Sequence, residues 1–436
     1  MYDLGITGGY AYINGSFRKT NIYIQNGTIS HIGGEELPCD DKYDAAGKKI
    51  IPGLMDPHVH FDLDTGSHTS CDDFQSGSVS AAYGGITTFF DFLDPVSDAG
   101  GIKPALEKRM KMAEGSIIDY SFHATLANPA GHTKEMVDEA MELGLSSIKV
   151  FTTYSESGRR TYDREIRELL ALSKDRGFVL MVHAENDNMV EILPGQKVWD
   201  ITYARNEEAE ISEALNLAGM VEETGGELYM VHVSSGHTVQ ALASRYPNLL
   251  GRKFHIETCP HYLYFNLHEY DRNDGYLYTM IPPLRSRRAQ GLLLNNAPHI
   301  ETVGTDHCPY MRKEKNKEYL AGIPMGVGGV EYSFPAMYGF FGKRAIDMMS
   351  LNPARIFGLY PGKGVLMEGS DADIAIFSDN GPYIKATDHS KCDYSIYTEG
   401  RGAFASMITV DTVISRGRFV IRDKELKGGK GKCLLS

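Results

Sequence analysis

The feature that most constrains the fold is an alternation of strand-like and helix-like stretches through the middle of the chain. Two helix-like stretches, Asp163–Ser173 and Glu207–Glu223, repeat apolar residues with helical spacing. The eight apolar, strand-like runs are Ile51–Phe61, Ile86–Phe92, Ile117–Leu126, Ser147–Phe151, Phe178–Glu185, Glu227–Ser234, Lys253–Cys259 and Glu301–Asp306. Eight β/α alternations predict a (β/α)8 TIM-type barrel. A doubly wound open sheet is the alternative, but its glycine-rich phosphate-binding fingerprint is missing.

The two ends of the chain have a different pattern, made of short alternating strands and turn residues. Tyr10–Ile13 runs into Asn14-Gly15, and Asn21–Ile24 runs into Asn26-Gly27, both of which are hairpin turn dipeptides. The expected C-terminal strands are Ala372–Phe377, Ala405–Val410 and Thr412–Gly417, followed by a Gly/Lys-rich segment, Lys427–Lys432, that we expect to fray. So few strands cannot bury a core alone. We therefore expect both ends to form one composite β-sandwich, rather than two separate edge sheets.

These patterns define the expected domains. The predicted boundaries are residues 1–51 and 361–436 for the two parts of the β-sandwich and residues 52–360 for the barrel. The barrel range has ample length for this fold, which typically takes about 250 residues.

Composition and charge exclude several classes of protein. The chain of 436 residues is 42% apolar and 23% charged, as is usual for a soluble enzyme. Its net charge of -13 and lack of a basic tract argue against binding to nucleic acid or to an anionic membrane. No apolar run approaches the ~20 residues of a transmembrane helix, and the N-terminal residues lack a signal-peptide pattern. The six scattered cysteines form no CxxC pair, which indicates a reducing, cytoplasmic location.

Residues that can bind metal stand where five of the predicted strands end, and in a barrel these ends form the functional face. The residues are His58, His60, Lys149, His183, His232 and Asp306. His58 and His60 are two apart in a strand, so they share a face and can reach one ion. Together these residues predict a metal centre, for which Zn²⁺ is the best match and Mn²⁺ or Fe²⁺ are alternatives.

Lys149 is the least ordinary member of this set. Its neighbours Ile148 and Val150 are apolar and should face the helices, which turns Lys149 into the barrel lumen. An unpaired ammonium is costly to bury. Carboxylation of the amine to a carbamate would remove the charge and supply two oxygen ligands, so we expect carboxylated Lys149 to bind metal.

Nine short motifs follow one another along nearly the whole chain. They are Gly53–His60, Asp72–Phe74, Gly84–Thr88, Lys149–Tyr154, Glu257–Pro260, Pro282–Arg285, Gly304–Pro309, Asn352–Ala354 and Gly369–Asp373. In this order the motifs resemble the cyclic amidohydrolases of the amidohydrolase superfamily, in particular the dihydropyrimidinase/hydantoinase branch. The resemblance implies hydrolysis of a cyclic amide or ureide, such as a 5,6-dihydropyrimidine or a hydantoin, to an N-carbamoyl amino acid.

The resemblance also implies a binuclear zinc site and its mechanism. It assigns His58, His60 and Asp306 to one Zn²⁺ and His183 and His232 to the other, with carboxylated Lys149 and a hydroxide as bridges. The hydroxide attacks the ring carbonyl, Asp306 passes its proton to the leaving nitrogen, and Tyr154 donates to the developing oxyanion. The same resemblance implies a homo-oligomer, a tetramer or a dimer.

Two positions depart from the family pattern near the expected substrate. Ile281 stands where many relatives have Ser before Pro-Pro-Leu-Arg, and Met325 stands where many have Asn. The family uses backbone atoms at both places to hold the substrate ring. We therefore expect Ile281 and Met325, with Tyr154, to contact the substrate.

The loop after the first barrel strand, Phe61–His68, is expected to lie over the site. It contributes Phe61 and Leu63 as apolar groups and Asp62 and Asp64 as anions, and it contains no Arg or Lys. A pocket without a cation would leave a substrate carboxylate unpaired. We therefore predict that dihydrouracil or a 5-substituted hydantoin is preferred over dihydroorotate by at least ~10²-fold.

Three other functions remain to be weighed. Dihydroorotases place Arg two residues after the HxH pair, whereas this chain has Asp62 there. A second alternative among the cyclic amidohydrolases is an allantoinase. Animal relatives that lost their metal ligands act as non-catalytic scaffolds, but every ligand position is filled here, which favours an enzyme.

Overall fold

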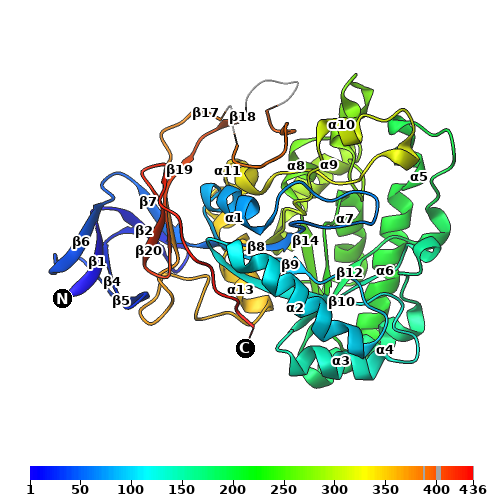
Figure 1. Ribbon diagram of the computed structural model, residues 1–436, viewed down its shortest axis with the longest axis horizontal. Coiled ribbons are helices and arrows are strands. Elements are labelled where there is room, and N and C mark those ends of the chain that lie inside the picture. The colour runs from blue at the N-terminus through cyan, green and yellow to red at the C-terminus, as the bar shows by residue number, and fades with distance from the viewer. Residues whose placement is uncertain (386–387, 399–403, 436) are drawn as a thin grey trace.

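The eight predicted barrel strands form a single parallel sheet in the computed structural model, which describes residues 1–385, 388–398 and 404–435. The strands are β8 (Leu54–Val59), β9 (Ile86–Phe92), β10 (Asp119–Thr125), β11 (Ser147–Phe151), β12 (Val179–His183), β13 (Leu228–Met230), β14 (Phe254–Thr258) and β15 (Thr302–Val303). They neighbour one another in chain order from β8 to β15. The ring closes where Asp306 N donates to His58 O at 2.8 Å and His60 N donates to His307 O at 3.0 Å. The predicted barrel is confirmed (Figure 1).

Helices follow the strands and surround the barrel (Figure 1). The longer ones are α1 (Phe74–Tyr83), α2 (Ile102–Met112), α3 (Thr133–Glu142), α4 (Asp163–Arg176), α6 (Glu207–Thr224), α7 (Gly236–Arg245), α9 (Arg287–Asn295) and α11 (Ser333–Phe341). The shorter ones are α5 (Ile201–Ala204), α8 (Pro260–Tyr264), α10 (Arg312–Lys315), α12 (Arg344–Met348) and α13 (Leu351–Ile356). The two stretches predicted from helical spacing, Asp163–Ser173 and Glu207–Glu223, lie in α4 and α6. None of the helices in the described ranges combines the length and apolar character needed to cross a bilayer.

The sequence shows directly why α6 begins and ends where it does. Asn206 accepts a hydrogen bond from Ala209 N at 3.0 Å and so caps the first turn. Three glutamates in that turn lie at the positive end of the helix dipole. Gly225, with φ of 73°, ends the helix in the left-handed conformation.

The side chains of the barrel strands alternate between two cores. One set packs inside the lumen and consists of Phe90, Phe92, Val179, Met181, Tyr229, Val231 and Phe357. The intervening residues, such as Leu180 and Val182, pack outward against the helices. In the β11–β12 register Lys149 lies opposite Met181, whereas Ile148 and Val150 lie opposite Leu180 and Val182. Lys149 is therefore on the lumen face.

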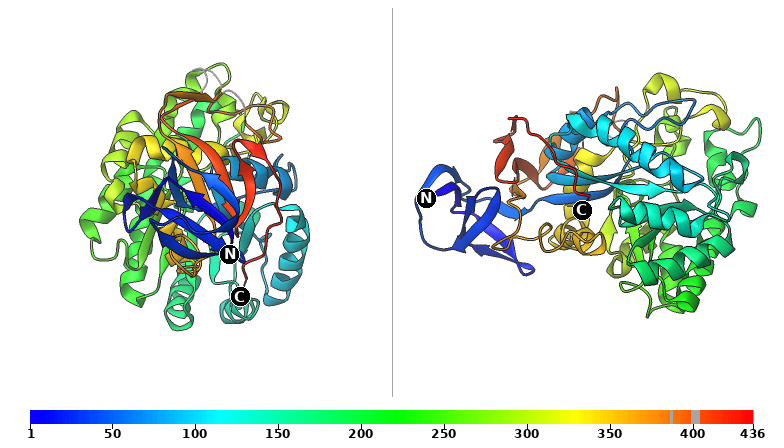
Figure 2. Two further views of the ribbon diagram at one scale, coloured as in Figure 1. Left: turned by 90° about the vertical axis from the view of Figure 1, so that its left-hand side faces the viewer. Right: turned by 60° about the horizontal axis from the view of Figure 1, so that its bottom comes forward.

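A β-sandwich lies beside the barrel and contains both ends of the chain (Figures 1 and 2). One sheet is entirely N-terminal, in the order β5 (Thr28–Gly33), β4 (Asn21–Gln25), β1 (Tyr2–Thr7) and β6 (Cys39–Asp44). The other is composite, in the order β21 (Glu425–Leu426), β20 (Arg418–Arg422), β19 (Thr409–Ser415), β16 (Ile374–Ser378), β7 (Lys49–Pro52), β2 (Tyr10–Ile13) and β3 (Ser16–Lys19). Ile6, Ile24, Ile50, Ile374 and Ile414 belong to one buried core. The composite sandwich is confirmed.

Two expectations for the C-terminal segment are wrong. Ala405–Val410 is not one strand, because Ser406 Oγ accepts from Ile408 N at 3.1 Å and turns the chain. Residues 404–406 form β18 (Phe404–Ser406), which pairs with β17 (Tyr383–Lys385), while β19 joins the composite sheet.

The Gly/Lys-rich tail is docked rather than frayed (Figure 2). Gly431 N donates to Ser116 O at 2.8 Å, and Tyr120 N donates to Lys432 O at 3.0 Å. A Cβ at position 431 would lie 2.0 Å from Ile118 O, so this close approach requires glycine.

Candidate active site

Three of the predicted ligands meet where β8 and β15 end. Their potential ligand atoms all lie within 4.8 Å of one another. Asp306 Oδ1 lies 3.1 Å from His60 Nε2 and 3.4 Å from His58 Nε2. Burial by itself would raise the pKa of Asp306, but the two imidazoles hold it below its ordinary value. The result is an anionic oxygen between two imidazole nitrogens, which is the donor set that a divalent transition-metal ion takes.

The other two histidines continue this cluster. His183 Nδ1 lies 2.9 Å from His232 Nε2. The rings of His60, His58, His232 and His183 form a row with successive centroid distances of 5.1, 5.5 and 4.6 Å. Burial lowers the pKa of His183 to about 4 and that of His232 well below its ordinary value, so both rings are neutral near pH 7. Neutral imidazole is the form that binds metal.

Lys149 reaches the same space from the lumen face of β11. Its side chain is buried, and Nζ lies 5.3 Å from the ring centroid of Phe92. Within the described part of the chain, no acceptor or carboxylate pairs with Nζ. Burial lowers the pKa of Lys149 to about 8. The lowered pKa makes the neutral amine accessible close to neutral pH.

Two carboxylates that the sequence analysis left without a role hold these histidines. Glu257 Oε1 lies 2.8 Å from His58 Nδ1 and accepts from His232 N at 2.9 Å. Glu185 Oε2 lies 2.7 Å from His183 Nε2 and also accepts from Arg205. A carboxylate on one ring nitrogen fixes the tautomer and leaves the other nitrogen as a donor to metal. Glu257 and Glu185 could have been noticed in the sequence, because each is an acidic residue within an otherwise apolar strand run.

Three of the predicted site residues have left-handed backbone conformations. The φ angles are 71° at Tyr154, 40° at His232 and 50° at Asp306. This region is unfavourable for residues with a Cβ, at about 1–3 kcal/mol each, and such residues concentrate at functional sites. Each of the three lies two or three residues after the end of a barrel strand, so the turn aims the side chain at the barrel mouth.

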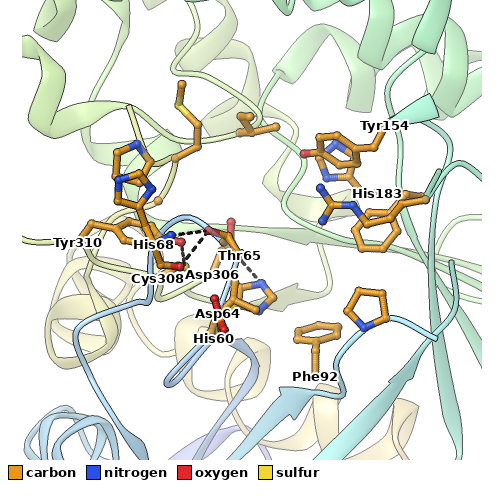
Figure 3. Close-up of a pocket in the computed structure, with 18 of the residues that line it drawn as sticks. His60, Asp64, Thr65, His68, Phe92, Tyr154, His183, Asp306, Cys308 and Tyr310 are labelled. Atoms are coloured by element: carbon orange, nitrogen blue, oxygen red, sulfur yellow. Dashed lines mark hydrogen bonds and ion pairs between the residues drawn. The ribbon is translucent and has the colours of Figure 1, made fainter. Parts of the chain in front are cut away.

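The ligands form the floor of a cavity of about 550 Å³, a size suited to a small organic molecule. Tyr154, Ile281 and Met325, the predicted substrate contacts, all line it. Figure 3 shows Tyr154 and His183 on one side and His68, Cys308 and Tyr310 on the other. Burial raises the pKa of Tyr154, so its hydroxyl stays protonated and can donate.

The expectation for the loop Phe61–His68 is partly wrong. Leu63 and Asp64 line the cavity, but Phe61 and Asp62 do not. The Phe61 ring is buried 5.0 Å from the ring of Phe89, and Gly77 leaves room for it. Asp62 therefore adds no charge to the cavity wall.

The expectation of a cavity without a cation beyond the ligand set is also wrong. Arg159, which the sequence analysis missed, lies in the cavity wall. Its guanidinium is 4.8 Å from the ring centroid of Tyr154.

Comparisons with known proteins agree with this geometry. The model of the Amidohydrolase family matches residues 50–420. The chain is 31% identical to the D-hydantoinase of Streptomyces coelicolor, over 98% of this chain and 96% of that protein. It is 32% identical to the D-phenylhydantoinase of Escherichia coli O81 (strain ED1a), over 95% and 94% of the two chains.

Solved structures give the same result. The D-hydantoinase from a Bacillus sp. AR9 matches with a TM-score of 0.93 and 29% identity, over 99% of this chain and 98% of that one. The dihydropyrimidinase from Brevibacillus agri NCHU1002 matches with a TM-score of 0.91 and 27% identity, over 100% and 98%. The protein therefore belongs to the amidohydrolase family and is a homologue of hydantoinases and dihydropyrimidinases.

Proposed function

We propose that this protein hydrolyses a cyclic amide or ureide, a hydantoin or a 5,6-dihydropyrimidine, to an N-carbamoyl amino acid. The observation that carries the proposal is the row of four imidazoles beside Asp306 and Lys149 on the floor of a cavity of about 550 Å³. The names of the relatives, hydantoinase and dihydropyrimidinase, support the same ring class.

The donors support two divalent ions, with Zn²⁺ as the first choice and Mn²⁺ or Fe²⁺ as alternatives. The proposed ligand sets are His58, His60 and Asp306 for one ion and His183 and His232 for the other, with carboxylated Lys149 between them. The bound ions would supply the positive charge that acidifies water and polarises the ring carbonyl.

The remaining steps belong to side chains of this chain. Asp306, kept anionic by its two imidazole neighbours, accepts the proton of the attacking water and delivers it to the leaving ring nitrogen. The hydroxyl of Tyr154 donates to the carbonyl oxygen as negative charge develops there. Glu257 and Glu185 keep the imidazoles in fixed orientations. Ile281 and Met325, which line the cavity, would border the ring.

A turnover screen tests the proposal. Purified, metal-loaded protein is incubated with dihydrouracil, dihydrothymine, hydantoin, 5-phenylhydantoin, allantoin and dihydroorotate, and ring opening is measured for each. We expect the hydantoins or the dihydropyrimidines to give the highest kcat/KM. Highest efficiency on allantoin would instead support an allantoinase, and an absence of turnover with loaded protein would support a scaffold.

We further propose that the protein is a cytoplasmic homo-oligomer, a dimer or a tetramer. Within each chain, we propose that residues 52–360 form the barrel and residues 1–51 and 361–436 form the sandwich. All six cysteines are free thiols, as in a reducing compartment. Light scattering on the purified protein tests the assembly, and a mass of one chain would contradict it.

A further inference from the structure

Arg159 places a positive charge in one wall of the cavity, and no carboxylate among the described residues pairs with it. Among the residues that the structure describes, four charged side chains line the cavity, namely Asp64, Lys149, Arg159 and Asp306. Lys149 and Asp306 belong to the proposed ligand set, which leaves one anion and one cation to meet a substrate. Arg159 is partly exposed, so its charge is available to a molecule that enters the cavity.

The other arginines near this wall are already neutralised. Arg160 forms an ion pair with Asp187 at 3.1 Å. Arg205 forms a buried ion pair with Glu185 at 2.6 Å. Within the described ranges, by contrast, Arg159 pairs with no carboxylate, and its Nε donates only to Ser157 Oγ at 3.0 Å. Its two terminal nitrogens are therefore free to donate in parallel to one carboxylate.

The turn after β11 fixes the position of Arg159. Tyr154 takes the left-handed conformation, and Arg159 N donates back to Tyr154 O at 3.1 Å. The guanidinium is 4.8 Å from the Tyr154 ring centroid and 5.9 Å from that of Phe151. The guanidinium therefore lies beside Tyr154, the proposed oxyanion donor. Figure 3 shows Asp64 near His60 and away from Tyr154.

We propose that Arg159 is a specificity-determining residue that binds a carboxylate on the ring's exocyclic substituent. Such a substrate is a hydantoin or dihydropyrimidine whose side chain ends in a carboxylate. This inference rests on the proposed function and names its substrate class. It replaces the expectation of a preference for neutral substituents.

The test compares two isosteric rings, 5-(2-carboxyethyl)hydantoin and 5-(2-carbamoylethyl)hydantoin, which differ in charge but hardly in size. We expect the wild-type kcat/KM to favour the acid by about tenfold or more, the usual scale of a charge-assisted contact at a partly exposed site. The ratio should fall as salt is added. In Arg159→Met the preference should disappear, while kcat/KM for 5-methylhydantoin stays within about twofold.

Two variants control this result. Arg159→Lys keeps the charge and should keep part of the preference. Arg164→Met removes a charge from an exposed position of α4, outside the cavity wall, and should keep the wild-type ratio. A wild-type ratio of one or less, or a preference that survives Arg159→Met, would overturn the inference. A loss of turnover for all rings in Arg159→Met, with the ratio unchanged, assigns Arg159 a packing role against Tyr154 and also overturns it.

Binding separates this inference from the proposed function. Calorimetry measures the affinity of wild type and Arg159→Met for the ring-opened acids N-carbamoylglutamate and N-carbamoylglutamine. A preference for the glutamate derivative that depends on Arg159 supports the specificity role without any turnover. Turnover of 5-methylhydantoin by wild type reports the proposed function alone, so each claim can fail while the other stands.

Discussion

The two ends of the barrel use similar residues in opposite ways. At the carboxyl end of the strands, Lys149 is buried without an anionic partner in the described chain, and burial lowers its pKa to about 8. Towards the amino end, Lys363 is equally buried but contacts Asp119 at 2.9 Å and Asp371 at 2.9 Å, and also Asp373. These carboxylates outweigh burial and raise the pKa of Lys363.

The histidines show the same contrast. Burial lowers the pKa of His232 well below its ordinary value at the carboxyl end, where no carboxylate among the described residues pairs with its ring. At the other end, burial alone would lower the pKa of His255, but Glu227 at 3.2 Å and Glu301 at 3.0 Å raise it to about 9. Paired groups stabilise the fold, whereas unpaired buried groups reduce stability until a ligand neutralises them. The contrast therefore marks the carboxyl end as the functional one.

The largest expected effect comes from Lys149→Met. This variant should lose most of its bound metal and more than about 10³-fold in kcat/KM, because it cannot form the proposed carbamate ligand. Metal analysis and hydantoin turnover measure both effects. After chelation, the variant should be at least as stable to urea as chelated wild type, since an unpaired buried amine has been removed. Normal metal content with a normal rate would refute the carbamate.

Lys363→Met, towards the amino end of the strands, should lower the stability of the fold but leave activity and metal content unchanged, which is the opposite of Lys149→Met. Lys363→Met leaves Asp373 buried without its cation, while Asp119 keeps Arg416 at 3.0 Å, so the free energy of unfolding should fall by about 3–5 kcal/mol. Activity per folded molecule and metal content should be unchanged. Urea denaturation followed by circular dichroism measures the loss. A loss below about 1 kcal/mol would mean that this cluster does not stabilise the fold.

Tyr154→Phe separates catalysis from metal binding within the carboxyl end. It removes the hydroxyl but keeps the ring that packs near His183, with centroids 5.3 Å apart. The variant should retain both ions and lose roughly 10²–10³-fold in kcat, the scale of one oxyanion donor. If kcat is unchanged, Tyr154 only packs against its neighbours.

The smallest effect concerns the pH dependence of stability at His255. The pKa of about 9 in the folded state exceeds the ordinary value of 6.5. Its contribution is therefore fully present below about pH 6.5 and is lost as the pH rises through about 9. Relative to His255→Gln, wild type should lose about 1–3 kcal/mol of stability over this window. Urea titrations of both proteins at several pH values measure it. A constant difference between them would show that the ion pairs contribute no net stability.

Much of the metal site could be predicted because it depends on strand periodicity. His58 lies on β8 and His60 directly follows it, and Lys149 stands between apolar neighbours on β11, so both registers follow from alternation. The fold class was predictable for the same reason, since eight β/α units and two strand-rich ends leave few arrangements.

The cavity wall could not be predicted because it depends on turns. Phe61 continues the alternation and packs in the outer core with Val59, and the positive φ of 53° at Asp62 then ends the pattern before Leu63 and Asp64 reach the cavity. At Tyr154 a left-handed residue folds the next turn back and brings Arg159 to the cavity. Single residues with positive φ do not appear in a hydrophobic pattern. The roles of Glu257 and Glu185 depend on contacts between strands, which are also absent from it.

The most direct test of the account is a metal titration of the chelated protein. Zn²⁺ is added in steps to metal-free protein of known concentration, and hydrolysis of 5-methylhydantoin is followed at each step. The account predicts no activity without metal, and a rise that stops at about two ions per chain, as expected for a two-metal site. Full activity in protein shown to be metal-free would contradict it.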